Sequence, residues 1–208
     1  MRRLDDTQKR LRTFALRPPR HSLGEVYNIC SKMAVGDATM DQALDLVEDI
    51  SAPIVRMAGR EIIPTFKDYI SRNNLDVVRD IKRFELPYPI GRSPDGKTLT
   101  IPVRPTFICI ENERLKPYFL IGWSTLAYTG YQKELLSTII CRSLLTHQNF
   151  IGSDAQIVCF PRIKHTKTRD IREWRATLYG TLSEDDLLTQ FERYGAALNL
   201  VARELRGQ

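Results

Sequence analysis

The chain has 208 residues, of which 42% are hydrophobic and 27% are charged, so it has enough apolar material to bury a substantial core. No stretch approaches the roughly 18 to 20 unbroken apolar residues that a membrane span requires, and no apolar run follows the basic N-terminus as it would in a signal peptide. We therefore expect a cytoplasmic protein without membrane contact. The net charge of +6 is compatible with a polyanionic partner but does not require one.

Residues 1–21 predict a basic N-terminal arm. Arginine and lysine recur along this segment, with Arg10 and Arg12 near its centre, and a short apolar stripe could form one helix. Pro18 and Pro19 end any such helix. Two interpretations stay open: a frayed terminus, or an arm that becomes ordered on a phosphate backbone or an acidic partner.

Helical periodicity predicts a layer of antiparallel helices over residues 22–74. A capping box is expected at Ser22 with Glu25, and a second at Thr39 with Gln42. The third helix begins at Pro53, and its interior Pro64 is expected to kink or split it because proline removes a helical hydrogen bond.

The segment 97–123 is the most β-like part of the chain. Residues 98–123 predict a hairpin whose turn lies at Asn112 and Glu113, and residues 84–90 could supply a further leading strand. The second half of the hairpin is apolar without alternation, which predicts layers of structure on both of its faces.

The rest of the chain alternates between helices and short strands. We predict helices at 130–147 and 183–206 and strands at 155–160 and 174–179. The fold class is therefore α+β: an N-terminal helical layer, then a small mixed or antiparallel sheet built on the 98–123 hairpin and covered by the helices 130–147 and 183–206. Residues 22–208 are expected to form one domain, with the sheet and its covering helices in 84–208.

Metal and cofactor sites are not expected. The four cysteines have apolar neighbours and form no C-x-x-C pair, and the six-residue spacing between Cys141 and His147 is no recognised zinc pattern. The sequence also lacks a P-loop, a dinucleotide-binding glycine motif and a hydrolase nucleophile motif. We therefore assign no catalytic residue, no metal ligand and no cofactor.

An enzyme of unrecognised type remains an alternative. It would require folding to bring together groups that are unconnected in sequence. The candidates for such a site are Asp95, Glu111, Glu113 and His147.

Positive charge is concentrated between the last two predicted strands. Seven residues in fourteen positions are cationic or can become so, and the aromatic residues Phe160 and Trp174 flank them, which is typical of an anion-binding surface. A solvated loop is the alternative. The predicted nucleic-acid-binding residues are Arg162, Lys164, His165, Lys167, Arg169, Arg172 and Arg175, together with Arg10 and Arg12 of the arm.

The C-terminal helix carries an apolar stripe at four- and three-residue spacing. Phe191, Tyr194 and Leu198 are its candidate interface residues, for a protein partner or a second copy of the chain. Docking onto the same domain is the favoured interpretation, because one domain must bury this face.

The order of elements over about 98–179 resembles the core of the PD-(D/E)XK nuclease-like superfamily. In that family an acidic residue on one strand and an E-x-K motif on the next hold a divalent metal. Thr106 stands where the aspartate would follow Pro105, and the strand 119–123 has neither glutamate nor lysine. Because a hard divalent cation needs carboxylate oxygens, the resemblance implies a catalytically inactive copy.

The sequence thus favours a non-catalytic domain that contacts DNA, RNA or another polyanion through 162–175. A scaffold subunit that uses the C-terminal helix is the next alternative. Neither the kind of nucleic acid nor the partner follows from the residues.

Overall fold

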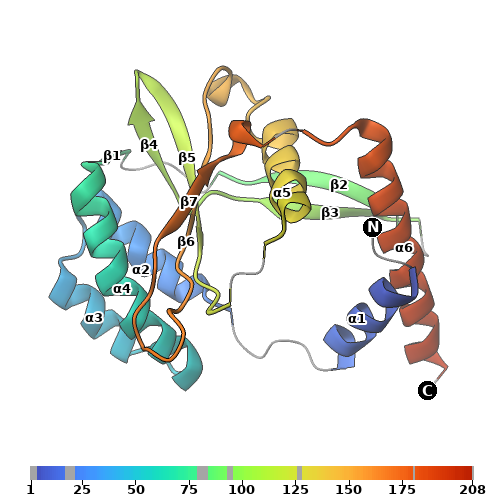
Figure 1. The fold of residues 1–208 in the computed structure, drawn as a ribbon, viewed down its shortest axis with the longest axis horizontal. Helices are drawn as coiled ribbons and strands as arrows, with labels where there is room; N and C mark the ends of the chain where they lie inside the picture. The colour runs from blue at the N-terminus through green and yellow to red at the C-terminus, as the bar shows by residue number, and fades with distance from the viewer. Residues whose placement is uncertain are drawn as a thin grey trace. The chain divides into compact units, whose positions relative to one another are not determined.

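A computed structural model describes residues 4–16, 22–78, 84–92, 96–125, 128–179 and 181–207, without the side chain of Phe14. The chain divides into two compact units, whose elements are labelled in Figure 1. The first unit consists of residues 1–20, 87–103 and 182–208, and the second of residues 21–86 and 104–181. Distant segments of the chain pair with one another to form the first unit, and the expectation of one domain over 22–208 stays a prediction.

The first unit joins segments from the beginning, middle and end of the chain. It contains α1 (Leu4–Leu16), the paired strands β2 (Leu86–Arg92) and β3 (Thr98–Val103), and α6 (Glu184–Arg206). Helices α1 and α6 lie side by side, and Gln8 Nε2 donates a hydrogen bond to Glu204 Oε1 at 2.6 Å.

One sequence-based placement changes as a result. Residues 98–103 pair with β2 rather than extending the central hairpin, because Pro102 and Pro105 cannot donate to a longer ladder. The helix expected over 183–206 is present as α6, which packs along α1 within the first unit. The leading strand expected near 84–90 is present as β2.

The second unit begins with α2 (Gly24–Val35), α3 (Met40–Glu48) and α4 (Pro53–Asn73). The capping box of Thr39 and Gln42 is confirmed, with both reciprocal hydrogen bonds formed. The expected Ser22 box is not formed: Ser22 Oγ accepts from the Gly24 amide, and the helix has Leu23 as its N-cap. Helix α4 is not split at Pro64 but continues through it.

The central sheet has the strand order β1-β4-β5-β6-β7. Its strands are β1 (Asp76–Val77), β4 (Phe107–Glu111), β5 (Arg114–Ile121), β6 (Gln156–Cys159) and β7 (Arg172–Arg175). Only β5 and β6 pair in parallel among these strands; the other pairs are antiparallel. The predicted turn at Asn112 and Glu113 is confirmed, with φ values of 52° and 62°, as a tight two-residue hairpin requires.

Helices lie on both faces of this sheet (Figure 1), as the apolar run in β5 predicted. Helices α2, α3 and α4 form a buried core with alternate residues of β4, β5 and β6, such as Leu120 and Val158. On the opposite face lies α5 (Gly130–Ser143), which begins at a capping box formed by Thr129 and Gln132. The α+β class is therefore confirmed.

Two short 3-10 helices complete the second unit: η1 (Gln148–Phe150) and η2 (Ala176–Leu178). The strand expected over 174–179 ends at Arg175, because the Asp154 carboxylate accepts hydrogen bonds from the amide and hydroxyl of Thr177 and turns the chain. No helix in the described ranges is long and apolar enough to span a membrane.

Candidate nucleic-acid interface

The basic segment between β6 and β7 folds into an ordered hairpin. Arg162 and Arg169 form an antiparallel bridge at its base, and the Ile163 amide donates to the Thr168 carbonyl at 3.0 Å. Thr166 Oγ1 donates to the Ile163 carbonyl at 3.0 Å, which closes the tip. The loop expected from the sequence is thus a preorganised structure, and its shape does not need to be created on binding.

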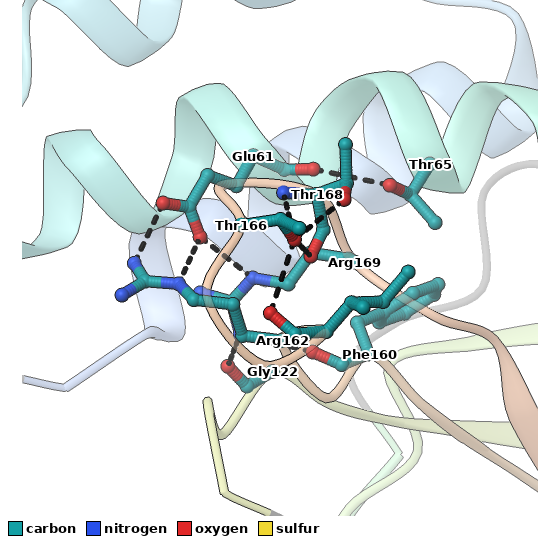
Figure 2. A network of polar contacts seen from close by, with 9 residues as sticks. Glu61, Thr65, Gly122, Phe160, Arg162, Thr166, Thr168 and Arg169 are labelled. Atoms are coloured by element: carbon teal, nitrogen blue, oxygen red, sulfur yellow. Dashed lines mark hydrogen bonds and ion pairs between the residues drawn. The ribbon is translucent and has the colours of Figure 1, made fainter.

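A buried carboxylate joins both ends of this hairpin to helix α4 (Figure 2). Arg162 makes a two-bond contact with Glu61, through Nη2 to Oε1 at 2.6 Å and Nε to Oε2 at 3.1 Å. Arg169 Nε donates to the same Oε2 at 2.8 Å. Planar guanidinium groups suit this arrangement, because each presents parallel donors to a carboxylate.

Arg169 also donates hydrogen bonds to carbonyl groups that follow the ends of two strands. Its Nη1 donates to the carbonyl oxygens of Gly122 and Phe160, at 3.0 and 2.9 Å, just beyond the carboxyl ends of the parallel strands β5 and β6. Burial lowers the pKa of Arg169, and the adjacent Glu61 charge opposes that shift. The side chain of Arg169 is 2% exposed, so it is a structural cation at this edge of the sheet.

The cluster keeps a positive charge. One Glu61 carboxylate neutralises one of the two guanidinium groups, so Glu61, Arg162 and Arg169 together carry a net charge of +1. The Arg162 side chain is 34% exposed, and it is therefore the member of the cluster that an external anion can reach. An arginine held by a buried partner presents its remaining donors in a fixed direction.

An apolar groove of about 460 Å³ lies against this cluster. Trp123 stands in its lining with 58% of its surface exposed, and Ile54 and Met57 of α4 are 60% and 47% exposed. Arg162 and Arg169 also line it. The groove therefore combines an exposed aromatic ring, apolar side chains and the net positive cluster.

Tyr27 fixes the backbone below the groove. The Gly122 amide donates to Tyr27 Oη at 2.8 Å, and burial raises the pKa of Tyr27, so its hydroxyl stays neutral. A side chain at position 122 would press on Ile62 and Leu23, with a Cβ atom 2.6 Å and 2.9 Å from their Cδ1 atoms. Glycine therefore lets the strand end lie close to α4 and to the chain that enters α2.

The predicted basic residues lie on several different elements. Lys164, His165 and Lys167 lie exposed at the hairpin tip. Arg172 and Arg175 lie on β7, beside the carboxylates of Asp170 and Asp154, at 3.1 and 3.9 Å. Arg10 and Arg12 belong to α1 of the first unit, where Arg12 contacts Glu204 at 3.7 Å.

Of the alternative catalytic candidates, the three that the structure describes lie at different places in the fold. Glu111 forms an ion pair with Lys116 at 2.5 Å, and Glu113 lies in the β4–β5 turn. His147 Nδ1 accepts from the Asn149 amide, and Asp95 lies outside the described residues. Among the side chains that the structure describes, no three His, Cys, Asp or Glu residues converge as a metal site.

A second hollow of about 490 Å³ lies over the sheet near the end of α4. Within it, Glu173 Oε2 accepts from Tyr69 Oη and Gln156 Nε2, both at 2.9 Å. Lys116, whose side chain is 7% exposed, forms its ion pair with Glu111. These polar groups satisfy one another, so their contacts explain their burial without a ligand.

The candidate interface residues of α6 differ in exposure. Phe191 and Leu198 are half-buried, and Tyr194 is 36% exposed. The Phe191 ring packs against Tyr88 of β2, with centroids 6.0 Å apart. Part of the apolar stripe predicted on this helix thus packs inside the first unit.

Comparison with known proteins identifies no family. The chain matches no protein-family model and no curated protein. One solved structure, "Crystal structure of SSO0001", aligns with 91% of this chain and 84% of its own, at 12% sequence identity and a TM-score of 0.37. A likeness of this size carries no argument about function, so a functional proposal has to rest on the geometry of the chain itself.

Sequence patterns did not reveal Glu61 or Trp123. Glu61 directly precedes Ile62 and Ile63, both fully buried, and a carboxylate next to such residues is a signal of an internal ion pair. Trp123 ends an apolar strand, where burial is the ordinary expectation. Only the fold indicates that its ring is exposed.

Proposed function

We propose that this protein is a non-catalytic domain that binds a polyanion, with nucleic acid as the preferred class, through the 162–169 hairpin. The observation that carries the proposal is the net positive cluster of Glu61, Arg162 and Arg169 at the base of that hairpin. Lys164 and Lys167 extend the positive surface from this base to the exposed tip. Binding of this kind is driven by the release of counterions from the phosphate backbone.

The internal contacts of the cluster also support a non-catalytic role. Carboxylate and carbonyl oxygens of the kind that hard cations prefer are present at Glu61, Gly122 and Phe160, but they accept hydrogen bonds from Arg169. Thr106, which the resemblance to the nuclease-like superfamily matches to its aspartate, accepts from the Leu120 amide at 3.1 Å. We therefore retain an inactive nuclease-like domain as part of the proposal.

A salt titration tests the proposal directly. Binding of fluorescent single-stranded DNA, duplex DNA and heparin is measured by anisotropy over a range of salt concentrations. The unmodified protein should lose affinity steadily as salt rises. Reversing both tip charges, Lys164→Glu with Lys167→Glu, should weaken binding and lower the single-strand salt slope by about 1.4, or about 0.7 for each lost phosphate contact.

The matched control reverses two exposed charges elsewhere, Lys32→Glu on α2 with Arg72→Glu near the end of α4. It changes the net charge by the same amount but should leave the salt slope unchanged if the hairpin is the contact surface. An equal loss of affinity in both double variants would indicate a general effect of net charge. Absent or salt-insensitive binding would remove the proposed function.

A second candidate is a scaffold subunit that associates through α6. It is favoured by exposed apolar side chains on this helix, notably Leu188, which is 52% exposed, and Tyr194. Sedimentation at several concentrations tests it, since association should disappear in a Leu188→Glu variant. A monomer at every concentration would exclude self-association.

A further inference from the structure

The exposure of Trp123 is not explained by the stability of the fold. The other tryptophan, Trp174, is 6% exposed, whereas Trp123 leaves 58% of its surface in solvent. The Trp123 ring stacks on Tyr128, with centroids 5.9 Å apart and planes inclined by 26°. The stack restrains the indole while the groove beside it stays open.

The groove has the chemistry expected for a flat ring linked to an anion. The indole and the side chains of Ile54 and Met57 offer apolar contact, and Arg162 adds a charged group at the same wall. Nucleobases stack on exposed aromatic side chains while cations beside them hold the phosphates. A base within a duplex is already stacked on its neighbours, so an unpaired base suits the groove better.

The hairpin places further cations within reach of the same strand. Arg162 lies at its base, and the Arg162 amide donates to the Ser124 carbonyl at 3.0 Å, directly after Trp123. Lys164 is two residues further on, so at about 3.3 Å per residue its backbone lies within roughly 7 Å of that of Arg162. Lys167 belongs to the same short turn. The cations are therefore spaced to meet successive phosphates.

We propose that the groove binds a base of single-stranded nucleic acid by stacking it on Trp123, while Arg162, Lys164 and Lys167 contact the flanking phosphates. This inference rests on the proposed function, because it names which nucleic acid the hairpin takes. Trp123 is then the residue that distinguishes a single strand from other polyanions.

The experiment uses the full chain carrying Trp174→Phe, so that Trp123 is its only tryptophan. Its fluorescence is followed while twelve-nucleotide oligothymidylate, a duplex of equal length or heparin is added at low salt. Oligothymidylate should quench the fluorescence, and heparin should bind without quenching. In the unmodified background, Trp123→Ala should weaken oligothymidylate binding roughly 5- to 150-fold, as the loss of one stacked base predicts.

The control is Ile151→Ala, which removes another apolar side chain that is 67% exposed and does not line the groove. It should leave oligothymidylate affinity unchanged, and Trp123→Phe should retain most of it. Salt-dependent binding that Trp123→Ala leaves intact would overturn the stacking inference while the proposed function stands. A lack of salt-dependent binding to every polyanion would overturn both.

Discussion

At the scale of single residues, Glu61 has the largest structural role in the candidate interface. Its side chain is 7% exposed and is the shared partner of two arginines from a distant part of the chain. Removing one partner of a buried ion pair is costly because the remaining charge stays desolvated. The interface and the stability of the second unit therefore depend on the same carboxylate.

Glu61→Gln should lower the free energy of unfolding by about 3 to 5 kcal/mol. The amide keeps the size of the side chain but cannot neutralise either guanidinium. Urea denaturation followed by tryptophan fluorescence measures the change. The control, Glu48→Gln, removes the exposed partner of Arg60 and should have little effect. Similar losses in the two variants would contradict the central role of Glu61.

The buried thiols predict a loss of stability at alkaline pH. Burial raises the pKa of Cys109 and Cys159 to about 12 and that of Cys30 further, so all three stay protonated in the folded protein. Thiols of the unfolded chain ionise near pH 8.5. Their contribution to stability is thus fully present below about pH 8.5 and is lost as the pH rises towards 12, by up to about 1.4 kcal/mol per unit for each thiol.

Urea midpoints at pH 7.5 and pH 10 measure this effect. The midpoint should fall at the higher pH, and Cys109→Ala should reduce the size of the fall. The native thiols should also react slowly with a disulfide reagent at pH 8, with half-buried Cys141 reacting first. Fast labelling of all four cysteines in the native state would contradict the conclusion that Cys30, Cys109 and Cys159 are buried and protonated.

At the scale of elements, the close packing of α3 on α4 depends on Gly59. A Cβ atom at this position would lie 2.8 Å and 2.9 Å from the two methyl carbons of Val47. Val47 is fully buried and has no space to move away. Glycine therefore sets how closely the two helices approach.

Gly59→Ala should destabilise the protein by about 1 to 3 kcal/mol through overpacking, despite the higher helix propensity of alanine. The matched control is Gly195→Ala in α6, where an added Cβ meets no atom within 4 Å. That change should be neutral or stabilising by up to about 1 kcal/mol. Thermal unfolding followed by circular dichroism distinguishes them, and a stabilising Gly59→Ala would show that the helices can separate.

Local signals predicted most elements correctly. The boxes at Thr39 and Thr129 mark helix starts, and the apolar run of β5 indicated a strand covered on both faces, because each depends on neighbouring residues only. The partners of β3 and α6 depend on contacts between distant segments, which no local pattern contains. The basic segment between the last two strands was recognisable because its charges are close together in sequence, whereas its partner Glu61, about 100 residues away, was not.

At the scale of the whole molecule, the second unit has its own hydrophobic core. All the residues of that core lie within 26–160, and both tryptophans also lie in the second unit. A chain that ends at Thr181 loses α6, and with it the partner of α1. The two units can therefore be perturbed separately and followed by different signals.

The chain ending at Thr181 should keep a cooperative unfolding transition in tryptophan fluorescence while its helical circular dichroism decreases. The point variant Leu187→Asp tests the same idea in the full chain, because Leu187 is 2% exposed on α6. It should unfold the first unit and leave the fluorescence midpoint close to that of the unmodified protein. Loss of the fluorescence transition in both would mean that the second unit needs the first in order to fold.

The three-segment construction of the first unit also sets an order for folding during synthesis. Helix α1 is made before α6, and its partner Glu204 is added almost 200 residues later. At typical rates of translation α1 would wait about 10 to 40 s for α6. The second unit, whose last strand ends at Arg175, is synthesised in that interval, so the basic hairpin precedes the completion of the first unit in the order of synthesis.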